Sequence, residues 1–245
     1  MFPFLKNHPF AVEAHFEKSI VLTFAVPKEQ LESLIPSRLQ LDTFQDKWAF
    51  VAIALVQTKD LRPKGFPKLL GNDFFLIGYR IFVRYTNKAG KNLRGLYILK
   101  SETNKSKMER LGNIFTHYSY STTDINLAEE NDILTISSQQ SQFHVKLRLS
   151  GENIALPHHS PFSEWKEARR FAGPLPFTFN CNEHLDKVVI IEGVRENWTP
   201  SPIEVIDYDF EFLNTLPMDQ PVLANAFIIK GIPYFWKKGK LEQWP

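Results

Sequence analysis

The chain has 245 residues, a formal net charge of +2 and 43% hydrophobic residues, which is typical of a globular protein with a substantial core. The balanced charge and the lack of a long basic run give no indication of a nucleic-acid partner. No apolar run approaches the ~20 residues that cross a bilayer, and no signal peptide opens the chain, so we expect a soluble, cytoplasmic protein without a membrane partner. The single cysteine, Cys181, excludes an intramolecular disulfide and a cysteine-based metal site.

The first part of the chain predicts strands joined by short polar turns. Residues 19–26 are apolar and β-branched, which is typical of a strand, and the proline that follows them begins a short helix over 28–35. Further strands are predicted at 39–44, 48–58, 74–85 and 93–102, the first two as a hairpin. Strand 48–58 carries Ala49, Ala52 and Ala54, which indicate close packing or, as the less favoured alternative, room for a ligand.

The strand at 93–102 carries the candidate catalytic side chains. Because side chains alternate along a strand, Leu96, Ile98, Lys100 and Glu102 are expected on one face. Lys100 is then either drawn into an apolar interior, where a lysine can act as a nucleophile, or paired with Glu102 at the end of the strand. The sequence leaves both alternatives open.

More ionisable residues follow directly after this strand. A short helix is predicted over 103–111, with Lys105 either a second candidate nucleophile or a solvated helix residue. A strand is predicted over 116–121. In it His117 stands beside Tyr118, and these two are candidate ligand-binding residues, with acid–base chemistry at the histidine as one role and a half-buried structural histidine as the other.

Three arginines on neighbouring strands are further candidates for ligand binding. Arg80 and Arg84 share one face of strand 74–85, and Arg94 begins the strand that follows. A guanidinium presents a fork of donors that matches a carboxylate, so these residues can bind an acidic ligand. Each of them can equally be an ordinary outward-facing residue on a twisted sheet.

The second half of the chain continues with strands. They are predicted at 133–137, 143–149, 178–182, 187–197, 204–213, 225–230 and 234–236, with one helix at 162–172. Glu192 and Arg195 are expected to form a structural ion pair. Strand 204–213 has one acidic face, which suits either a protected sheet edge or the pairing of two copies in a homo-oligomer.

The order of these elements predicts the fold class. Hairpin turns dominate, and helices are too few to cover a parallel sheet. No internal repeat is visible, and no linker is long enough to separate domains. We therefore predict an α+β, mainly β protein, with a single domain over 1–245 that consists of large curved antiparallel sheets and a few short helices.

Two segments carry a resemblance to a known family. They read SIVLTFAVPKEQLESLIPSRLQLDTFQDKWAFVAIALVQTKDLRP and RGLYILKSETN. In them the chain resembles the YqjF-like family, a domain of unknown function (2071) in the acetoacetate decarboxylase-like superfamily. The resemblance extends from about 19 to 213. It implies a cone-like antiparallel β domain with a central cavity.

The resemblance also implies a chemistry. Decarboxylases of this superfamily form a Schiff base between a lysine and a β-keto acid, and a second, adjacent lysine lowers the pKa of the first. That lysine follows the strand that corresponds to 96–102. Here the corresponding segment reads ETNKSK, so a serine separates Lys105 from Lys107, and the glycine, aromatic residue and proline of the decarboxylase motif are missing.

Neither a cofactor nor a metal ion is predicted. The chain has no Ser-His-Asp order, no glycine-rich phosphate loop and no HExxH-type metal motif. The paired histidines His158 and His159 lack a cysteine or carboxylate at ligand spacing. The predicted partner is therefore a small organic molecule.

Two classes of function remain. In the first, the protein binds a small carboxylate or carbonyl compound in a central cavity without chemistry. In the second, it is a lysine-dependent lyase, such as a β-keto acid decarboxylase, with Lys100 or Lys105 as the nucleophile and Glu102 beside it. The missing pair of adjacent lysines favours the first class.

Overall fold

The computed structural model describes residues 3–149, 151, 154–196 and 198–244. Its strands are β1 (Val12–Pro27), β2 (Gln40–Leu41), β3 (Trp48–Pro63), β4 (Asn72–Thr86), β5 (Asn92–Thr103), β6 (Tyr120–Thr122), β7 (Asn126–Glu130), β8 (Ile133–Ser138), β9 (Phe143–Arg148), β10 (Phe177–Asn182), β11 (Lys187–Arg195), β12 (Ser201–Pro202), β13 (Glu204–Phe210), β14 (Val222–Trp236) and β15 (Lys240–Gln243). Its helices are α1 (Ser106–Phe115), α2 (Trp165–Ala172) and α3 (Glu211–Asn214), with 3-10 turns η1 (Pro3–Asn7), η2 (Lys28–Gln30), η3 (Glu32–Leu34), η4 (Lys68–Leu70) and η5 (Glu183–Leu185).

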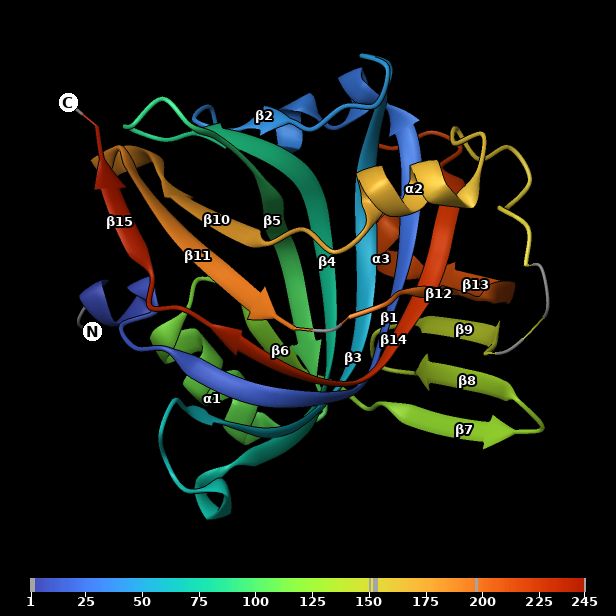
Figure 1. Cartoon of the computed structure of the whole chain (residues 1–245), viewed down its shortest axis with the longest axis horizontal. Coiled ribbons are helices and arrows are strands. Elements are labelled where there is room, and N and C mark those ends of the chain that lie inside the picture. The colour runs from blue at the N-terminus through green and yellow to red at the C-terminus, as the bar shows by residue number, and fades with distance from the viewer. Residues whose placement is uncertain (1–2, 150, 152–153, 197, 245) are drawn as a thin grey trace.

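The main sheet curves until it meets itself. Its strands follow the order β12-β14-β1-β3-β4-β5-β10-β11-β15, and an additional pairing of β11 with β14 closes the path. The closing pairs are Gly193 with Trp236, Val194 with Phe235 and Arg195 with Tyr234. Figure 1 shows β3 and β4 running side by side down the molecule next to β1, with β10 and β11 to their left. The ring of strands therefore encloses an interior, which is where a cavity is expected.

The strands of this sheet are apolar on both faces because both faces are covered. On the outer face, Leu22, Ile53 and Ile81 belong to one buried cluster with Val145 and Leu147 of a second sheet. This second sheet has the order β13-β9-β8-β7. In β9 buried and exposed residues alternate, as expected for a sheet with one face on a core and one face in water.

The two longer helices cover the inner face of the ring at separate places. α2 buries Ala168 and Ala172 against Phe50 and Phe82. α1 contacts β6 through Gly112, where an added Cβ would lie 2.3 Å from the Tyr120 ring, so only glycine permits this approach. The helices thus limit the interior to a central space between them.

The predicted fold class is confirmed: the protein is mainly β, with a large curved sheet and a few short helices. The pairings are antiparallel except for two short parallel ones, β5 with β10 and β5 with β6. Among the described residues, none of the helices combines the length and apolar character that crossing a membrane requires.

Several predicted local elements differ in detail. The helix expected at 28–35 consists of two 3-10 turns. The hairpin expected between 39–44 and 48–58 is reduced to one antiparallel bridge between Phe44 and Trp48, because β2 pairs with β4. The sequence predicts no strand at β7, whose five residues are all exposed and polar or isolated apolar, so they carry no alternating pattern. The strand expected at 204–213 ends at Phe210, where α3 begins.

Candidate functional site

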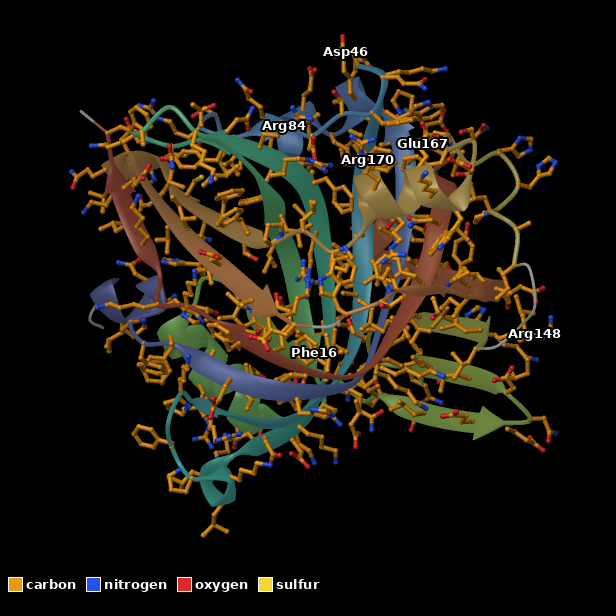
Figure 2. All side chains as sticks on the ribbon, in the orientation of Figure 1. Phe16, Asp46, Arg84, Arg148, Glu167 and Arg170 are labelled. Carbon is orange, nitrogen blue, oxygen red and sulfur yellow. The ribbon has the colours of Figure 1, made fainter. Side chains whose placement is uncertain are left out.

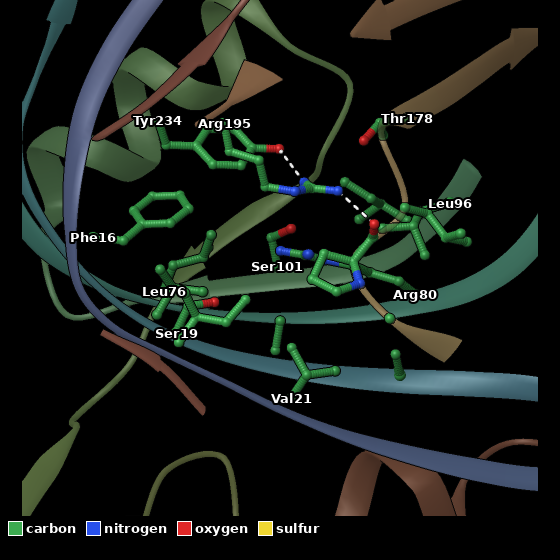
Figure 3. Close-up of a pocket in the computed structure, with 18 of the residues that line it drawn as sticks. Phe16, Ser19, Val21, Leu76, Arg80, Leu96, Ser101, Thr178, Arg195 and Tyr234 are labelled. Carbon is green, nitrogen blue, oxygen red and sulfur yellow. Dashed lines mark hydrogen bonds between the residues drawn. The ribbon is translucent and has the colours of Figure 1, made fainter. Parts of the chain in front are cut away.

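A cavity of about 120 Å³ lies inside the closed sheet (Figure 3). Ala52 and Ala54 of β3 form part of its wall, together with Val21 of β1 and Phe227 of β14. The small alanine side chains leave space that a leucine or phenylalanine would fill. Ala49, by contrast, packs into the outer core. Two of the three alanines noted in the sequence therefore line a cavity, whereas close packing was the favoured expectation.

Arg80 of β4 extends into this cavity (Figure 3). Gly78, two residues earlier on the same face, makes room for it, because a Cβ there would lie 2.8 Å from Arg80 Nε. The buried Nε has no hydrogen-bond partner among the described residues. No described carboxylate forms an ion pair with Arg80, and burial lowers the pKa of the guanidinium. Since arginine keeps its charge in proteins, a cation without a counterion lies inside the fold.

A second arginine, Arg195 of β11, reaches the same cavity. Its Nη1 donates to the Tyr234 hydroxyl at 3.3 Å, and its Nη2 donates to the Pro174 carbonyl oxygen (Figure 3). Its Cζ lies 5.2 Å from the centre of the Trp198 ring, at cation–π distance. Its Nε is buried and lacks a partner among the described residues. Arg195 is therefore held in place by neutral groups, and its charge stays available.

The predicted ion pair between Glu192 and Arg195 is wrong. Glu192 Oε1 instead accepts from Lys237 Nζ at 2.9 Å. Positions 192 and 195 are three apart on a strand, so they fall on opposite faces of the sheet. The alternation itself was thus the signal that could have placed Arg195 inside.

Hydroxyl groups surround the two guanidinium groups. Ser19, Ser101, Thr178 and the tyrosines Tyr118 and Tyr120 line the cavity. Burial raises the pKa of Tyr120 to about 12 and raises that of Tyr118 further. The Tyr118 hydroxyl lies beside Thr178 without a well-aligned hydrogen bond. These groups stay neutral at ordinary pH and can donate hydrogen bonds to an anion.

The lining as a whole favours an anion. Among the described residues that form the cavity wall, Arg80 and Arg195 are the charged ones, and no aspartate, glutamate or lysine lines it. Two guanidinium groups in a space that is otherwise apolar or hydroxylic raise the local potential. The arrangement can bind a carboxylate through charge-assisted hydrogen bonds. The described wall offers no lysine amine as a nucleophile.

The prediction that Leu96, Ile98, Lys100 and Glu102 share a face is wrong, because β5 carries a β-bulge. Tyr79 pairs with Lys100 and the next residue, Arg80, pairs with Ile98, so Leu99 is an extra residue. The alternation reverses at that point. Leu96 and Ile98 line the cavity as expected, but after the bulge it is Ser101 that joins them.

Lys100 and Glu102 lie on the outer face of the sheet as a consequence. Lys100 Nζ is 2.9 Å from Glu102 Oε1 and 5.0 Å from the centre of the Phe212 ring. Glu102, which is 2% exposed, also accepts from Ser141 Oγ at 2.5 Å. These two candidates line a separate polar cleft between the two sheets. Of the two alternatives that the sequence left open for Lys100, the structure has the pairing with Glu102 and not the amine in an apolar interior.

Arg84 and Arg94 share one acidic partner outside the cavity. Arg84 Nε donates to Asp42 Oδ1 at 2.5 Å, and Arg94 Nε donates to Asp42 Oδ2 at 2.6 Å. The Asp42 side chain is 0% exposed. In Figure 2 Arg84 lies near the upper edge of the molecule, far from Phe16, which lines the cavity. The structure thus separates Arg80 from the other two predicted arginines.

The two remaining candidates lie apart from the cavity as well. Lys105 is exposed at the start of α1. His117 Nε2 is 3.4 Å from Asn7 Oδ1, and burial together with the nearby Lys6 lowers its pKa. Of the predicted site residues, Arg80 and Tyr118 therefore come together in the cavity. Arg195, Ser101, Thr178 and Tyr234 are lining residues that the sequence analysis did not select.

Within the described part of the chain, no group of three or more histidine, cysteine, aspartate or glutamate residues is arranged to hold a metal ion. The rings of His158 and His159 contact each other, with their centres 3.9 Å apart. Among the described residues that line the cavity, the ionisable side chains are arginines and tyrosines.

Comparison with solved structures defines the class of fold. The acetoacetate decarboxylase from Legionella pneumophila subsp. pneumophila str. Philadelphia 1 is similar, with a TM-score of 0.63 and 11% identity over 96% of this chain and 89% of that chain. An acetoacetate decarboxylase-like enzyme from Sphingomonas wittichii RW1 has a TM-score of 0.59 and 10% identity, over 98% and 94%. The enduracididine biosynthesis enzyme MppR complexed with pyruvate has a TM-score of 0.55 and 8% identity, over 95% and 90%. The protein thus has an acetoacetate decarboxylase-like fold.

The family follows from the sequence comparison. Residues 13–241 match the DUF2071 family, which is described as an uncharacterized conserved protein. The chain belongs to this family, and the resemblance noted from its sequence is confirmed. A search of curated proteins found no match.

Proposed function

We propose that this protein binds a small organic carboxylate in its central cavity, with Arg80 as the principal contact and Arg195 as the second. The observation that carries the proposal is the Arg80 guanidinium, which lines the cavity and has no carboxylate partner among the described residues. A buried cation without a counterion is costly, so its presence is explained best by an anion that arrives from outside. That one structural relative holds pyruvate, a small carboxylate, supports this choice of ligand class.

A lysine-dependent lyase is the alternative that the fold favours, because two of the similar structures are acetoacetate decarboxylases or resemble them. A Schiff base requires a lysine amine next to the bound carbonyl. Lys100 instead pairs with Glu102 in a different cleft, and Lys105 is exposed. The proposal therefore places recognition, and not imine formation, in the central cavity.

Calorimetric titration with paired ligands tests carboxylate recognition. Pyruvate, acetoacetate and butanoate are each compared with the neutral amide of the same shape. We expect the carboxylates to bind at least about tenfold more tightly, because each gains charge-assisted hydrogen bonds that the amide lacks. Equal affinity for acid and amide, or no binding of any carboxylate at millimolar concentration, would contradict the proposal.

Borohydride trapping separates the two classes of function. We expect no reduced adduct after incubation with pyruvate or acetoacetate, as measured by intact-protein mass spectrometry, because no described lysine lines the cavity. The variant Lys100→Ala is expected to bind carboxylates like the wild type. An adduct that peptide mapping assigns to Lys100 or Lys105 would support the lyase instead.

A further inference from the structure

An apolar groove lies next to the central cavity. It occupies about 430 Å³ between α1 and the end of the β3–β4 hairpin. Its wall includes Phe66 and Leu70 from the hairpin end, Phe74 from β4, and Met108 and Phe115 from α1. No acidic residue is among the described residues that line it. Phe66 is 53% exposed and Leu70 is 55% exposed, so large apolar side chains face an open space.

The groove and the cavity share a wall. Phe16, Leu76, Tyr118, Tyr120 and Trp236 line both spaces. Leu76 and Arg80 both belong to β4, so the groove continues along the strand that carries the unpaired guanidinium. This layer of mainly aromatic side chains lies between the mainly apolar groove and the cavity that holds the two arginines.

The sizes of the two spaces are complementary. Sites for organic ligands commonly occupy about 300–1,000 Å³. The cavity, at about 120 Å³, is below this range and holds little more than a charged head group. The groove, at about 430 Å³, lies within the range, and its wall is mainly apolar. It also holds two basic side chains, of which Arg62 forms an ion pair with Glu13 and Lys107 is exposed. The groove therefore offers the larger apolar surface, and the cavity offers two buried guanidinium groups that have no carboxylate partner among the described residues.

We propose that the ligand is an amphipathic carboxylate whose head group contacts Arg80 and Arg195 and whose aliphatic or aromatic tail extends past Tyr118 and Tyr120 into the groove. This inference rests on the proposed carboxylate site and adds the substrate class to it. Its occupant is argued from charge complementarity at the head and from the wall that the groove shares with the cavity. Because the shared wall separates the two spaces, the proposal requires side chains of that wall to move when the ligand binds.

A chain-length series tests the inference. Straight-chain carboxylates from acetate to decanoate are titrated calorimetrically at concentrations below their micelle formation. We expect the affinity to rise by about fourfold for each added methylene until the groove is filled, because each buried methylene is removed from water. 1-Octanol serves as a ligand with a tail and no charged head, and we expect it to bind at least about tenfold more weakly than octanoate.

Neighbouring leucines provide a matched pair of variants. Leu70 lines the groove, whereas Leu69 is 94% exposed and does not. The double variant Phe66→Ser, Leu70→Ser is expected to lose most of the gain with chain length and to keep its affinity for acetate. Leu69→Ser is expected to match the wild type throughout. Because all three residues are largely exposed, these substitutions should leave the fold intact.

The outcomes distinguish this inference from the proposed function. Affinity that does not change with chain length, with acetate still bound through Arg80, overturns the tail assignment and leaves the carboxylate site in place. No binding of any carboxylate overturns both. An affinity for octanoate that stays at the wild-type value in Arg80→Met overturns the assignment of the head group. Light scattering of the wild type and the same variants tests whether a second copy of this chain occupies the groove instead. If the wild type is a dimer and the double variant Phe66→Ser, Leu70→Ser is a monomer, the groove is an interface between two copies, and the tail assignment is overturned.

Discussion

The substitution Arg80→Met is expected to weaken carboxylate binding strongly and to stabilise the ligand-free protein at the same time. Removing the guanidinium deletes the principal charge-assisted contact, which should cost ~2 kcal/mol or more of binding free energy, or about 30-fold in affinity. The same change removes a cation that has no ion-pair partner among the described residues. Methionine is flexible and apolar, so it can fill the space beside Gly78. We expect the free energy of unfolding to rise by ~1–3 kcal/mol.

The opposite signs of these two effects are what make the experiment informative. Replacing a residue that only supports the fold lowers the stability of the protein, and the affinity for the ligand falls together with it. Chemical denaturation measures the stability change, and calorimetry with butanoate measures the affinity. Arg148→Met is the control, because Arg148 is exposed and pairs with Glu204 on the outer sheet. Unchanged affinity in Arg80→Met, or a clear loss of stability, would show that the guanidinium is satisfied within the fold.

The fold was largely readable from the sequence because most strands carry a local signal. The β-branched residues of β1 and the alternation of β9 are properties of consecutive residues. β9 was predicted in full, and β1 was predicted over its second half, at 19–26. What closes the sheet is a contact between segments about forty residues apart, where Arg195 pairs with Tyr234. No local pattern specifies that pairing, so the ring and its enclosed cavity came from the family resemblance and not from periodicity.

The residues of the candidate site could be predicted from the sequence only in part, because of an irregularity in β5. Alternation along β5 was interpreted without the bulge at Leu99, and one extra residue moves every later side chain to the other face. As a result, Ser101 lines the cavity at the place where the sequence analysis expected Lys100. Bulges depend on the partner strand, here on how Tyr79 and Arg80 align, and that information lies outside the strand itself. The sequence therefore indicated the correct strand and the wrong face.

The arginines show the same limit on the neighbouring strand. Arg80 and Arg84 share a face by alternation, so both were candidates for one carboxylate fork. Arg84 lies further along β4, next to the end of β2, and Asp42 follows directly after β2. The Asp42 carboxylate accepts a hydrogen bond from Arg84 and neutralises its charge. The distinction between a free guanidinium and a neutralised one depends on an acid some forty residues away in the chain. Only the structure brings the two together.

The substitution Asp42→Asn is therefore expected to destabilise the protein without changing carboxylate binding in the cavity. It would leave Arg84 and Arg94, whose Nε atoms lie 2.5 and 2.6 Å from the two carboxylate oxygens, without their shared counterion. Both arginine side chains are about one third exposed, at 38% and 33%, so water screens part of their repulsion. We expect a loss of ~2–3 kcal/mol in the free energy of unfolding, below the full cost of breaking a deeply buried pair.

Asp46→Asn is the matched control for this change, because Asp46 pairs with Lys28 at the surface with its side chain 86% exposed. Its stability should equal that of the wild type within error. Affinity for butanoate should stay within twofold of the wild type in both variants, since neither aspartate lines the cavity. If Asp42→Asn kept its stability but lost the ligand, Asp42 would act by holding Arg84 and Arg94 in position to bind the carboxylate. Recognition would then lie at the edge of the sheet, and the unpaired Arg80 would need a different explanation.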